Sequence, residues 1–261
     1  MAEQEYWKKF LGIEVFKIDH YFKSSLYRLL KITLPKLRCQ KDYWADRGRF
    51  YMNDIFSSGY LEREAFFQDM LVEELRGLEF RSLFEAGCGF GWNIKRVKND
   101  FSPMRVGGVD FSLPQLGNLK RKYMSSDKAQ VSCGDATKMP FCDNAFDVGI
   151  SVGVFMNIHP SNIQDAIKEM VRVSKKYIIH LEYDDKHTTK ELKKQRAIKT
   201  NIVSHDYRTL YQNLGKNILT FKTHLDFSDE YYKYQGKISS RYKFWIPFEG
   251  PEKYIFIVVE V

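Results

Sequence analysis

Hydrophobic positions recur with helical periodicity in the first part of the chain. Apolar side chains between residues 11 and 29 recur every three or four positions, with lysine and arginine between them, which predicts a basic amphipathic helix. Pro35 is expected to end this helix, because proline lacks the N–H that a helix interior needs. A second helical pattern spans about residues 60–76. Its apolar positions are Leu61, Ala65, Phe66, Met70 and Leu75. We therefore expect residues 1–76 to form a helical N-terminal extension that can act as a lid.

After residue 76 the pattern of hydrophobic positions changes. Short apolar runs alternate with helical stretches as far as residue 183, which is typical of βαβ units and a parallel sheet. The expected strands lie at residues 82–84, 106–109, 131–133, 148–152, 177–181, about 217–225 and about 253–261. We assign residues 77–261 to one α/β domain. Its segments 186–216 and 226–250 are expected on the substrate side, because long connections inside compact domains usually have a task.

Composition and charge add limits to this picture. Hydrophobic residues make up 44% of the 261-residue chain, so a packed core is expected. The net charge of +8 fits nucleic acid, an anionic membrane surface or an anionic substrate, and it also fits solubility alone. The four cysteines lack the spacing of a zinc module or a disulfide framework, so no metal site is predicted. The sequence contains neither a secretory signal nor an apolar run of membrane-spanning length, so a cytoplasmic location is expected.

A glycine-rich turn follows the first expected strand and opens a helix. Its sequence is Glu-Ala-Gly-Cys-Gly, at residues 85–89. Gly87 and Gly89 allow the backbone to turn tightly and to approach a ligand closely. The dinucleotide fingerprint requires a third glycine three places after the second, and Trp92 stands there instead. The turn therefore predicts a ligand site but departs from the pattern of a pyrophosphate site.

Polar side chains end four consecutive expected strands. These side chains are Glu85, Asp110, Asp135 and Ser151. Because the carboxyl ends of parallel strands form one crevice in an open sheet, we expect the four to surround a common ligand. A carboxylate at Asp110 can accept two hydrogen bonds from ribose hydroxyls. A single strand-end acid is commonly an ordinary turn residue, so the prediction depends on all four occurring in order.

With these residues the sequence resembles the class I S-adenosylmethionine-dependent methyltransferase family, in particular its small-molecule branch. The motifs that carry the resemblance are E-x-G-x-G at 85–89, G-V-D-F-S at 108–112, G-D-A at 134–136 and F-D-V-x-x-S at 146–151. They cover about residues 80–183 well and the two C-terminal strands loosely. The resemblance implies a Rossmann-like, doubly wound, mostly parallel sheet of seven strands whose last strand is antiparallel.

The resemblance also implies the cofactor S-adenosyl-L-methionine, with S-adenosyl-L-homocysteine as its product. By this resemblance the cofactor-binding residues are Glu85, Gly87, Cys88 and Gly89 for the methionine part, Asp110 for the ribose, Phe111, Asp135 and Ala136 for the adenine, and Ser151 and Val152 beneath the sulfonium. The sulfonium methyl group is already activated. The protein therefore mainly has to align donor and acceptor, although a hydroxyl acceptor also needs a base.

Candidates for that base and for substrate contacts come from position alone. His159, just after the fourth expected strand, is the first candidate for the catalytic base. Further candidates for the substrate side are the strand-end and helix-start residues His180, Glu182 and His205, and the N-terminal residues Trp44, Arg47 and Tyr51. Each of these can equally be an ordinary packing residue.

Absent motifs narrow the acceptor. The segment after the fourth expected strand lacks the N-P-P-Y-like sequence of adenine and glutamine amino methyltransferases, the Pro-Cys of cytosine C5 enzymes and the glutamate pair of protein arginine enzymes. A small-molecule acceptor remains, methylated on a hydroxyl or amine: a sugar, a metabolite or a lipid-linked intermediate. Three alternatives stay open. The basic tract 186–199 favours a tRNA or rRNA methyltransferase, the N-terminal helix favours a peripheral membrane protein on anionic lipid, and the fold alone allows a non-catalytic partner subunit.

Overall fold

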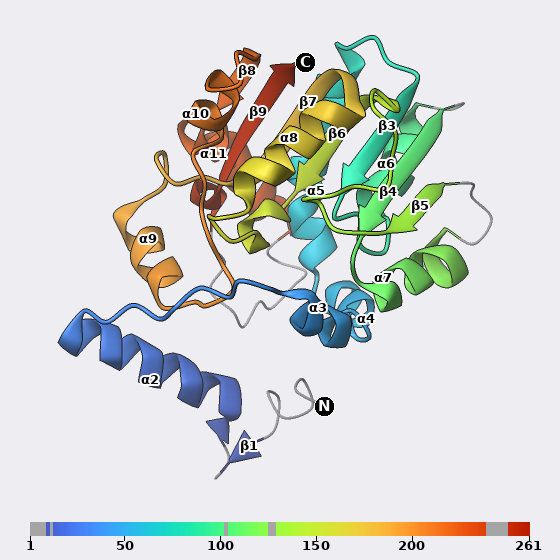
Figure 1. The fold of residues 1–261 in the computed structure, drawn as a ribbon. Helices are drawn as coiled ribbons and strands as arrows, with labels where there is room; N and C mark the ends of the chain where they lie inside the picture. The colour runs from blue at the N-terminus through green and yellow to red at the C-terminus, as the bar shows by residue number, and fades with distance from the viewer. Residues whose placement is uncertain (1–8, 11–12, 102–103, 125–128, 239–249) are drawn as a thin grey trace.

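A seven-stranded sheet forms the centre of the molecule (Figure 1). The computed structural model describes residues 9–10, 13–101, 104–124, 129–238 and 250–261. In spatial order the strands are β5 (Gln130–Cys133), β4 (Arg105–Asp110), β3 (Ser82–Ala86), β6 (Phe146–Val152), β7 (Ser174–Tyr183), β9 (Tyr254–Glu260) and β8 (Asn217–Lys222). Strands β5 to β7 pair in parallel, and β9 runs antiparallel to both of its neighbours. The predicted sheet, with its antiparallel last strand, is thereby confirmed.

Helices cover both faces of this sheet, as a doubly wound fold requires. One face packs against α8 (Ile163–Val173) and α10 (Tyr207–Gln212), and the other against α5 (Tyr60–Arg76), α6 (Trp92–Asp100) and α11 (His224–Ile238). The remaining elements of the sheet domain are α7 (Leu113–Asn118), the π-helical turn η1 (Leu119–Tyr123), the 3₁₀ turns η2 (Phe155–Asn157) and η3 (Pro251–Lys253), and α9 (Lys190–Ala197). No helix in the described ranges has the length and apolar character needed to cross a bilayer.

Two apolar layers hold the helices on the sheet, and β9 contributes to both. Ile255 and Ile257 pack on the side of α8, whereas Phe256 and Val258 pack on the side of α5. Every residue of the strand before Glu260 is buried. A strand buried on both faces has a continuous apolar sequence instead of an alternating one. Each fully buried side chain of this size stabilises the fold by roughly 1.5–3 kcal/mol.

The described residues before α5 form a small antiparallel strand pair and three helices. These elements are β1 (Lys9–Phe10), β2 (Ile13–Glu14), α2 (Val15–Leu30), α3 (Lys41–Arg47) and α4 (Tyr51–Ser57). The prediction that Pro35 ends the first helix was wrong, since α2 already ends at Leu30. Lys31 adopts a left-handed φ of 56°, which a right-handed helix cannot continue, and its N–H donates to the Tyr27 carbonyl.

The link between α2 and α3 is fixed to the segment that follows α9. The Lys36 ammonium donates hydrogen bonds to the carbonyls of Arg196, Lys199 and Ile202, each at 2.7 Å. Burial lowers the pKa of Lys36, and the nearby cations Arg196 and Lys199 lower it further. The link therefore ties the N-terminal helices to the sheet domain immediately before α3.

The long connection expected over residues 226–250 begins with a helix. On α11, Phe227 and Tyr231 lie one turn apart and pack against Phe67 of α5, with ring centroids 5.9 and 5.3 Å from the Phe67 ring. Tyrosine has an apolar ring as well as a hydroxyl, so a Tyr-rich helix can bury one face. Residues 239–249 of that connection lie outside the described residues.

Candidate functional site

The turn between β3 and α6 brings the backbone to the centre of the sheet's carboxyl end. Gly87 has a φ of 73°, and an added Cβ would lie 2.3 Å from Cγ1 of Val154, so only glycine fits there. The Gly87 N–H donates to the Val109 carbonyl at 2.7 Å. The Gly89 N–H donates to Oδ2 of Asp110 at 2.9 Å. The turn is thereby fixed against the end of β4.

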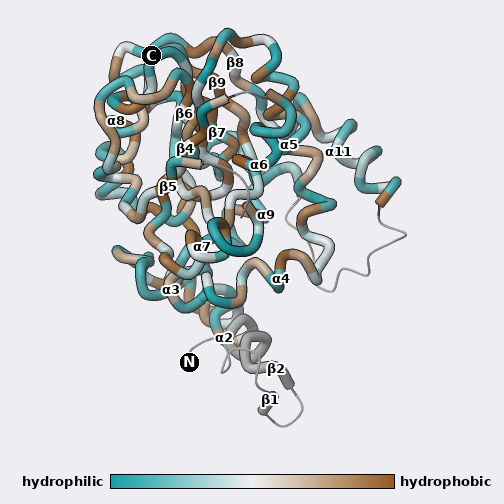
Figure 2. The backbone as a smooth tube through the Cα atoms, turned by 90° about the vertical axis from the view of Figure 1, so that its right-hand side faces the viewer, coloured by the Kyte–Doolittle hydropathy of each residue, from teal (hydrophilic) through white to brown (hydrophobic). Residues whose placement is uncertain are grey.

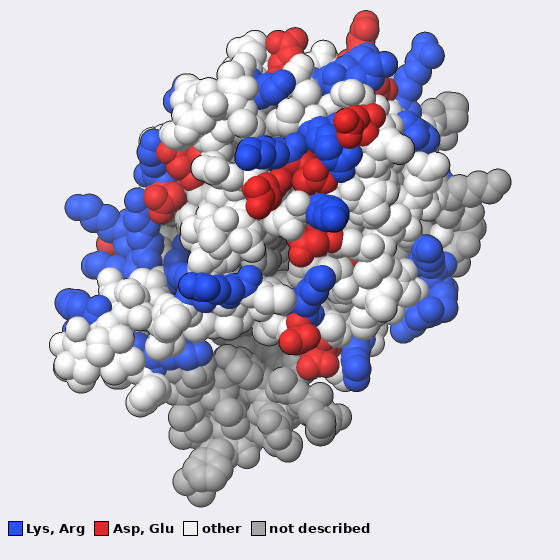
Figure 3. Space-filling model, in the orientation of Figure 1, with Lys and Arg blue, Asp and Glu red and all other residues white. Residues whose placement is uncertain are grey.

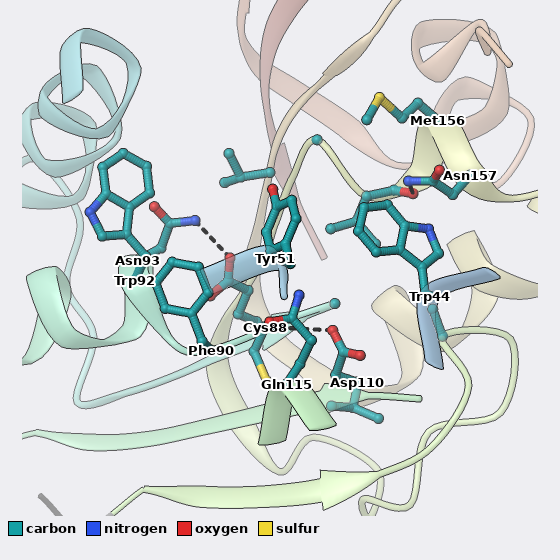
Figure 4. Close-up of a pocket in the computed structure, with 18 of the residues that line it drawn as sticks. Trp44, Tyr51, Cys88, Phe90, Trp92, Asn93, Asp110, Gln115, Met156 and Asn157 are labelled. Atoms are coloured by element: carbon teal, nitrogen blue, oxygen red, sulfur yellow. Dashed lines mark hydrogen bonds between the residues drawn. The ribbon is translucent and has the colours of Figure 1, made fainter. Parts of the chain in front are cut away.

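A cavity lies beside this turn, at the carboxyl ends of β3, β4 and β6 (Figure 4). All of the predicted cofactor-binding residues except Ser151 line it: Glu85, Gly87, Cys88, Gly89, Asp110, Phe111, Asp135, Ala136 and Val152. Of the predicted substrate residues, Trp44 and Tyr51 line it as well, whereas Arg47 does not. Residues from four different strand ends and from the N-terminal helices therefore meet around one hollow.

A buried carboxylate, Glu85, faces the cavity with one oxygen unpaired. Its Oε1 accepts a hydrogen bond from Nδ2 of Asn93 at 2.7 Å, whereas its Oε2 is buried without a partner. Asn93 is oriented in turn by Gln68, whose Nε2 donates to Oδ1 of Asn93 at 3.1 Å. Burial raises the pKa of Glu85 to about 8, the hydrogen bond from Asn93 opposes this shift, and the Asp110 carboxylate adds to it. A cationic hydrogen-bond donor in the cavity would satisfy Oε2.

The acid at the end of β4 is held by backbone N–H groups. Asp110 accepts from Gly89 through Oδ2 and from Ser112 through Oδ1, the latter at 2.7 Å. Burial raises the pKa of Asp110, and the two hydrogen bonds oppose this shift without cancelling it. Each carboxylate oxygen can accept a second hydrogen bond, so the fixed group can still receive two donors from a ligand. Asp135 is pinned in a similar way, because its Oδ1 accepts from both the N–H and the hydroxyl of Thr137.

Two side-chain amides present further unpaired oxygens. Oε1 of Gln115 and Oδ1 of Asn157 are buried without a hydrogen-bond partner, and both residues line the cavity. In Figure 4, Gln115 lies beside Asp110, and Asn157 lies beside Trp44. A buried acceptor without a donor costs roughly 1–3 kcal/mol. Unsatisfied groups at three points of one cavity are the property expected of a polar ligand site.

Aromatic rings from the N-terminal helices form one wall of the cavity. The Trp44 ring meets Tyr51 edge-on at a centroid distance of 5.4 Å, and Tyr51 in turn lies 6.3 Å from Phe90. Arg47 lies behind this wall, 5.4 Å from the Tyr51 centroid and 2.6 Å from the Asp54 carboxylate. Arg47 therefore supports the Tyr51 ring from outside the cavity.

A buried charged cluster borders the same cavity from α5 and β9. Oε1 of Glu64 accepts hydrogen bonds from Nζ of Lys253 at 2.8 Å and from Nε of Arg63 at 3.1 Å. The Tyr254 hydroxyl donates to Oε2 of Glu64 at 3.2 Å. Although burial alone would raise it, the pKa of Glu64 is lowered, because Lys253 and Arg63 stabilise the charged form. Glu64, Tyr254 and the neighbouring Tyr60 all line the cavity.

Three predicted site residues form a network behind the cavity. The Ser151 hydroxyl donates to Glu182 at 2.7 Å and lies 2.6 Å from Nδ1 of His180. Glu182 also accepts from the N–H groups of Val154 and Phe155, at 3.0 Å each. Burial raises the pKa of Glu182 to about 7 and lowers that of His180 to about 3, which leaves the imidazole neutral. Ser151, His180 and Glu182 therefore fix the turn after β6 from behind the cavity lining, and their assignment to cofactor or substrate stays a prediction.

The two remaining predicted histidines also lie outside the cavity lining. Nε2 of His205 is 3.1 Å from the Phe155 carbonyl and 3.0 Å from that of Ile158, so it donates to the same turn. Burial lowers the pKa of His205 to about 4. Nδ1 of His159 accepts from the N–H of Ser161 at 3.2 Å and serves the start of α8. Both histidines contact protein groups outside the cavity lining, and their roles as a base and as a substrate contact stay predictions.

The sequence analysis missed several residues of the cavity. Those that carry polar groups are Tyr60, Glu64, Gln68, Asn93, Gln115, Asn157 and Tyr254. One signal was available: Glu64 and Gln68 are four positions apart on α5, on the face that also carries Phe67 and Leu71. Polar side chains within the apolar face of a helix are candidates for a buried site.

Sequence comparison places part of the chain in a known family. Residues 84–177 match the family model described as "Methyltransferase domain". Demethylmenaquinone methyltransferase from Staphylococcus aureus (strain MRSA252) is 30% identical over 125 residues, which are 48% of this chain and 50% of that protein. The enzyme of the same name from Lactiplantibacillus plantarum is 35% identical over 92 residues, 34% of this chain and 38% of that protein. The chain thus spans half or less of the length of these curated relatives.

Solved structures share the fold over most of the chain. Magnesium protoporphyrin IX methyltransferase from Synechocystis PCC 6803, solved with bound S-adenosylhomocysteine, has a TM-score of 0.61 at 15% identity, covering 84% of this chain and 97% of that one. Geranyl diphosphate C-methyltransferase from Streptomyces coelicolor A3(2) has a TM-score of 0.57 at 18% identity, covering 76% of each chain. Likeness at these identities concerns the fold. The family match over residues 84–177, with the motifs at the strand ends, identifies this part of the chain as a methyltransferase domain.

Proposed function

We propose that the protein binds S-adenosylmethionine and transfers its methyl group to a small molecule. The observation that carries this proposal is the unpaired, buried Oε2 of Glu85 at the wall of the cavity. A ligand's ammonium group would satisfy this oxygen and favour the ionised carboxylate. The methionine part of the cofactor carries such an ammonium group, and the Gly87–Gly89 turn allows close approach of the backbone beside it.

Other groups of the cavity fit the remaining parts of the same cofactor. Asp110 keeps acceptor capacity on both oxygens, which suits the two hydroxyls of a ribose. Phe111 follows Asp110 at the end of β4, Asp135 and Ala136 follow β5, and these three residues suit the adenine. The bound cofactor supplies an activated methyl group. The chain's own residues then have to hold the acceptor in line with it and keep water out, which can contribute roughly 7–11 kcal/mol through positioning.

The acceptor we propose is a small molecule with an aromatic or otherwise apolar body. Trp44, Tyr51, Phe67 and Met156 supply apolar lining from outside the cofactor motifs. The relatives from Staphylococcus and Lactiplantibacillus act, by their names, on demethylmenaquinone, and an acceptor of that chemical type is consistent with such a lining. The hydroxyls of Tyr60 and Tyr254, next to the Glu64 carboxylate, are the polar groups best placed to receive the acceptor's own polar group.

Thermal unfolding with S-adenosylhomocysteine tests this function. A ligand that binds only the folded state stabilises it by about 2.7 kcal/mol at one hundred times its dissociation constant, which raises the melting temperature of a chain this size by roughly 5–10 °C. Asp110→Ala should lose most of that rise, because the ribose contact is removed. Asp165→Ala, at an exposed position of α8, serves as the matched control and should keep it. An unchanged melting temperature of the unmodified protein at saturating cofactor would contradict the proposal.

The RNA alternative rests on the basic tract 186–199, and part of this tract has a structural task. Arg196 is buried and donates to the carbonyls of Asp184 and Lys253. Lys186 forms an ion pair with Asp206 at 2.5 Å. Arg196 is engaged inside the fold and Lys186 is paired at its surface, so the tract gives weaker support to phosphate binding than its sequence indicates.

A further inference from the structure

Helix α2 exposes the apolar face of an amphipathic helix. Phe22 and Leu29 are seven residues apart, two helical turns, and therefore share one face. They are 67% and 78% exposed, and Leu30 beside them is exposed as well. Figures 1 and 2 both show α2 apart from the layers of helices that cover the sheet. Exposed side chains of this size in one patch mark an interaction site more often than a monomer surface.

The same end of the molecule carries further exposed apolar side chains. Tyr43 lies on α3, Phe50 precedes α4, Phe56 lies on α4, and Leu113 begins α7 with 67% of its surface exposed. In Figure 1, helices α2, α3, α4 and α7 all lie at the lower end of the view. Two of these helices also supply the aromatic wall of the cavity through Trp44 and Tyr51. The apolar surface is therefore continuous in position with the end of the molecule that contains the site.

Basic side chains accompany this surface. Arg28 and Lys31 are exposed at the end of α2, Lys41 begins α3, and Arg49 precedes α4. Three consecutive exposed cations, residues 120–122, follow α7. In Figure 3 the lower left of the molecule, where Figure 1 places α2, shows an uncharged surface with lysine and arginine beside it. Apolar side chains edged by cations are complementary to a surface that is apolar inside and anionic outside.

We infer that α2, together with the exposed residues of α3, α4 and α7, docks on the surface of an anionic lipid bilayer. A helix with an apolar face and lysine or arginine on its polar side lies in the plane of the lipid interface, with its apolar face among the acyl chains. Cations near the surface add attraction to anionic head groups. This orientation places the cavity-bearing end of the protein against the bilayer.

Sedimentation with lipid vesicles tests the docking surface. The full chain should sediment with vesicles of equimolar phosphatidylcholine and phosphatidylglycerol, much less with phosphatidylcholine alone, and less as salt is raised. The double variant Phe22→Ser with Leu29→Ser should bind the anionic vesicles at least about tenfold more weakly, because two large side chains no longer enter the acyl region. The matched control, Leu219→Ser with Leu225→Ser, changes exposed leucines on β8 and α11 and should bind as the unmodified protein does.

Charge reversal tests the electrostatic part separately. Arg28→Glu with Lys31→Glu should lower affinity for anionic vesicles about tenfold or more at low salt, whereas Lys233→Glu with Lys237→Glu on α11 should change it little. Equal binding by the α2 variants and their controls would overturn the inference. So would a dimer in sedimentation velocity that the Phe22 and Leu29 changes dissociate, since the face would then belong to a second copy. The thermal response to S-adenosylhomocysteine should stay intact in all four variants, which separates this test from that of the cofactor site.

Discussion

Replacing Glu85 by glutamine should change the ligand-free protein and its cofactor binding in opposite directions. Burial raises the pKa of Glu85 from 4.5 to about 8. The folded protein therefore keeps a proton on this side chain that the unfolded chain releases. Its free energy of unfolding should fall as the pH rises from about 5 to about 8. Glutamine retains the size of the side chain and a hydrogen bond with Asn93 but cannot ionise, so this dependence should disappear in Glu85→Gln.

The size of both effects follows from the site. The pKa difference between 4.5 and about 8 corresponds to about 4–5 kcal/mol of unfolding free energy. Water entering the cavity reduces this to about 2–4 kcal/mol between pH 5 and pH 8.5. A hydrogen bond to a charged group contributes about 1.5–3 kcal/mol. In Glu85→Gln, loss of the charged hydrogen bond between residue 85 and the cofactor's ammonium group should raise the dissociation constant of S-adenosylhomocysteine about 10- to 150-fold at pH 8.

Two measurements follow both effects. Urea unfolding from pH 5 to pH 8.5 gives the stability of the ligand-free protein, and titration calorimetry at pH 6, 7 and 8 gives the affinity for S-adenosylhomocysteine. In the unmodified protein the affinity should rise about tenfold per pH unit over this range, because Glu85 must release its proton to pair with the ammonium group. Glu73→Gln makes the same chemical change at an exposed position of α5 and should alter neither quantity.

The reasoning would be refuted by either of two results. One is an identical pH dependence of stability in Glu85→Gln and the unmodified protein, which would mean that Glu85 is not desolvated. The other is an unchanged affinity for S-adenosylhomocysteine in the variant, which would remove the ammonium contact from the proposed function.

Three further substitutions test individual contacts. Gly87→Ala should destabilise the fold by about 2–4 kcal/mol in urea unfolding, because its Cβ would lie 2.3 Å from Val154. Gly215→Ala, at a φ of 67° with open space around it, should cost only about 1–2 kcal/mol. Equal costs would contradict the packing argument for Gly87. Ser151→Ala should cost about 1–3 kcal/mol of stability but change the affinity for S-adenosylhomocysteine less than threefold. A large loss of affinity would instead support a direct contact between Ser151 and the cofactor. Lys36→Met should lower the free energy of unfolding by about 1–3 kcal/mol and speed amide hydrogen exchange in α3, because three backbone carbonyls lose their shared donor. Unchanged exchange would mean that the Lys36 link does not hold α3 in place.

The sheet was predictable because its sequence signals are local. Each of β3, β4 and β6 is an apolar run followed directly by a turn or a polar residue, and parallel pairing then brings the ends together. The strand-end acids Asp110 and Asp135 accordingly reached the cavity as predicted. The antiparallel last strand came from the family resemblance, since β9 alone has no property that sets its direction.

The sequence did not show that Ser151, His180 and Glu182 lie behind the cavity lining, because their positions depend on the register of the strands. Ser151 on β6 pairs with His180 on β7, and Glu182 follows on the same face of β7. A polar side chain near a strand end can point to the cavity or to its neighbouring strand. Only the pairing decides between them, and the pairing is a long-range property.

The N-terminal half of the site was predictable only in outline. The helix at 60–76 was expected, but its predicted apolar positions included Phe66 and Met70, whereas the buried face runs through Phe67, Leu71 and Leu75. Nearly every second or third position of this helix is apolar, so the sequence allows more than one face. Packing against both the sheet and α11 selects the face that carries Glu64 and Gln68 to the cavity.

The cavity wall that contains Trp44 and Tyr51 is formed by residues that precede the first strand of the central sheet. The residues proposed to bind the cofactor lie instead at the ends of the sheet's strands and in the loops between them. Insertions or exchanges before α5, which begins at Tyr60, would leave the strand ladder, the glycine turn and the Gln68 contact to Asn93 intact. Evolution could thus reshape what such a protein methylates by altering one contiguous N-terminal stretch, while the machinery for the donor is inherited unchanged. Chimeras that join the residues before Tyr60 of one homologue to the remaining chain of another are the natural way to exploit that division.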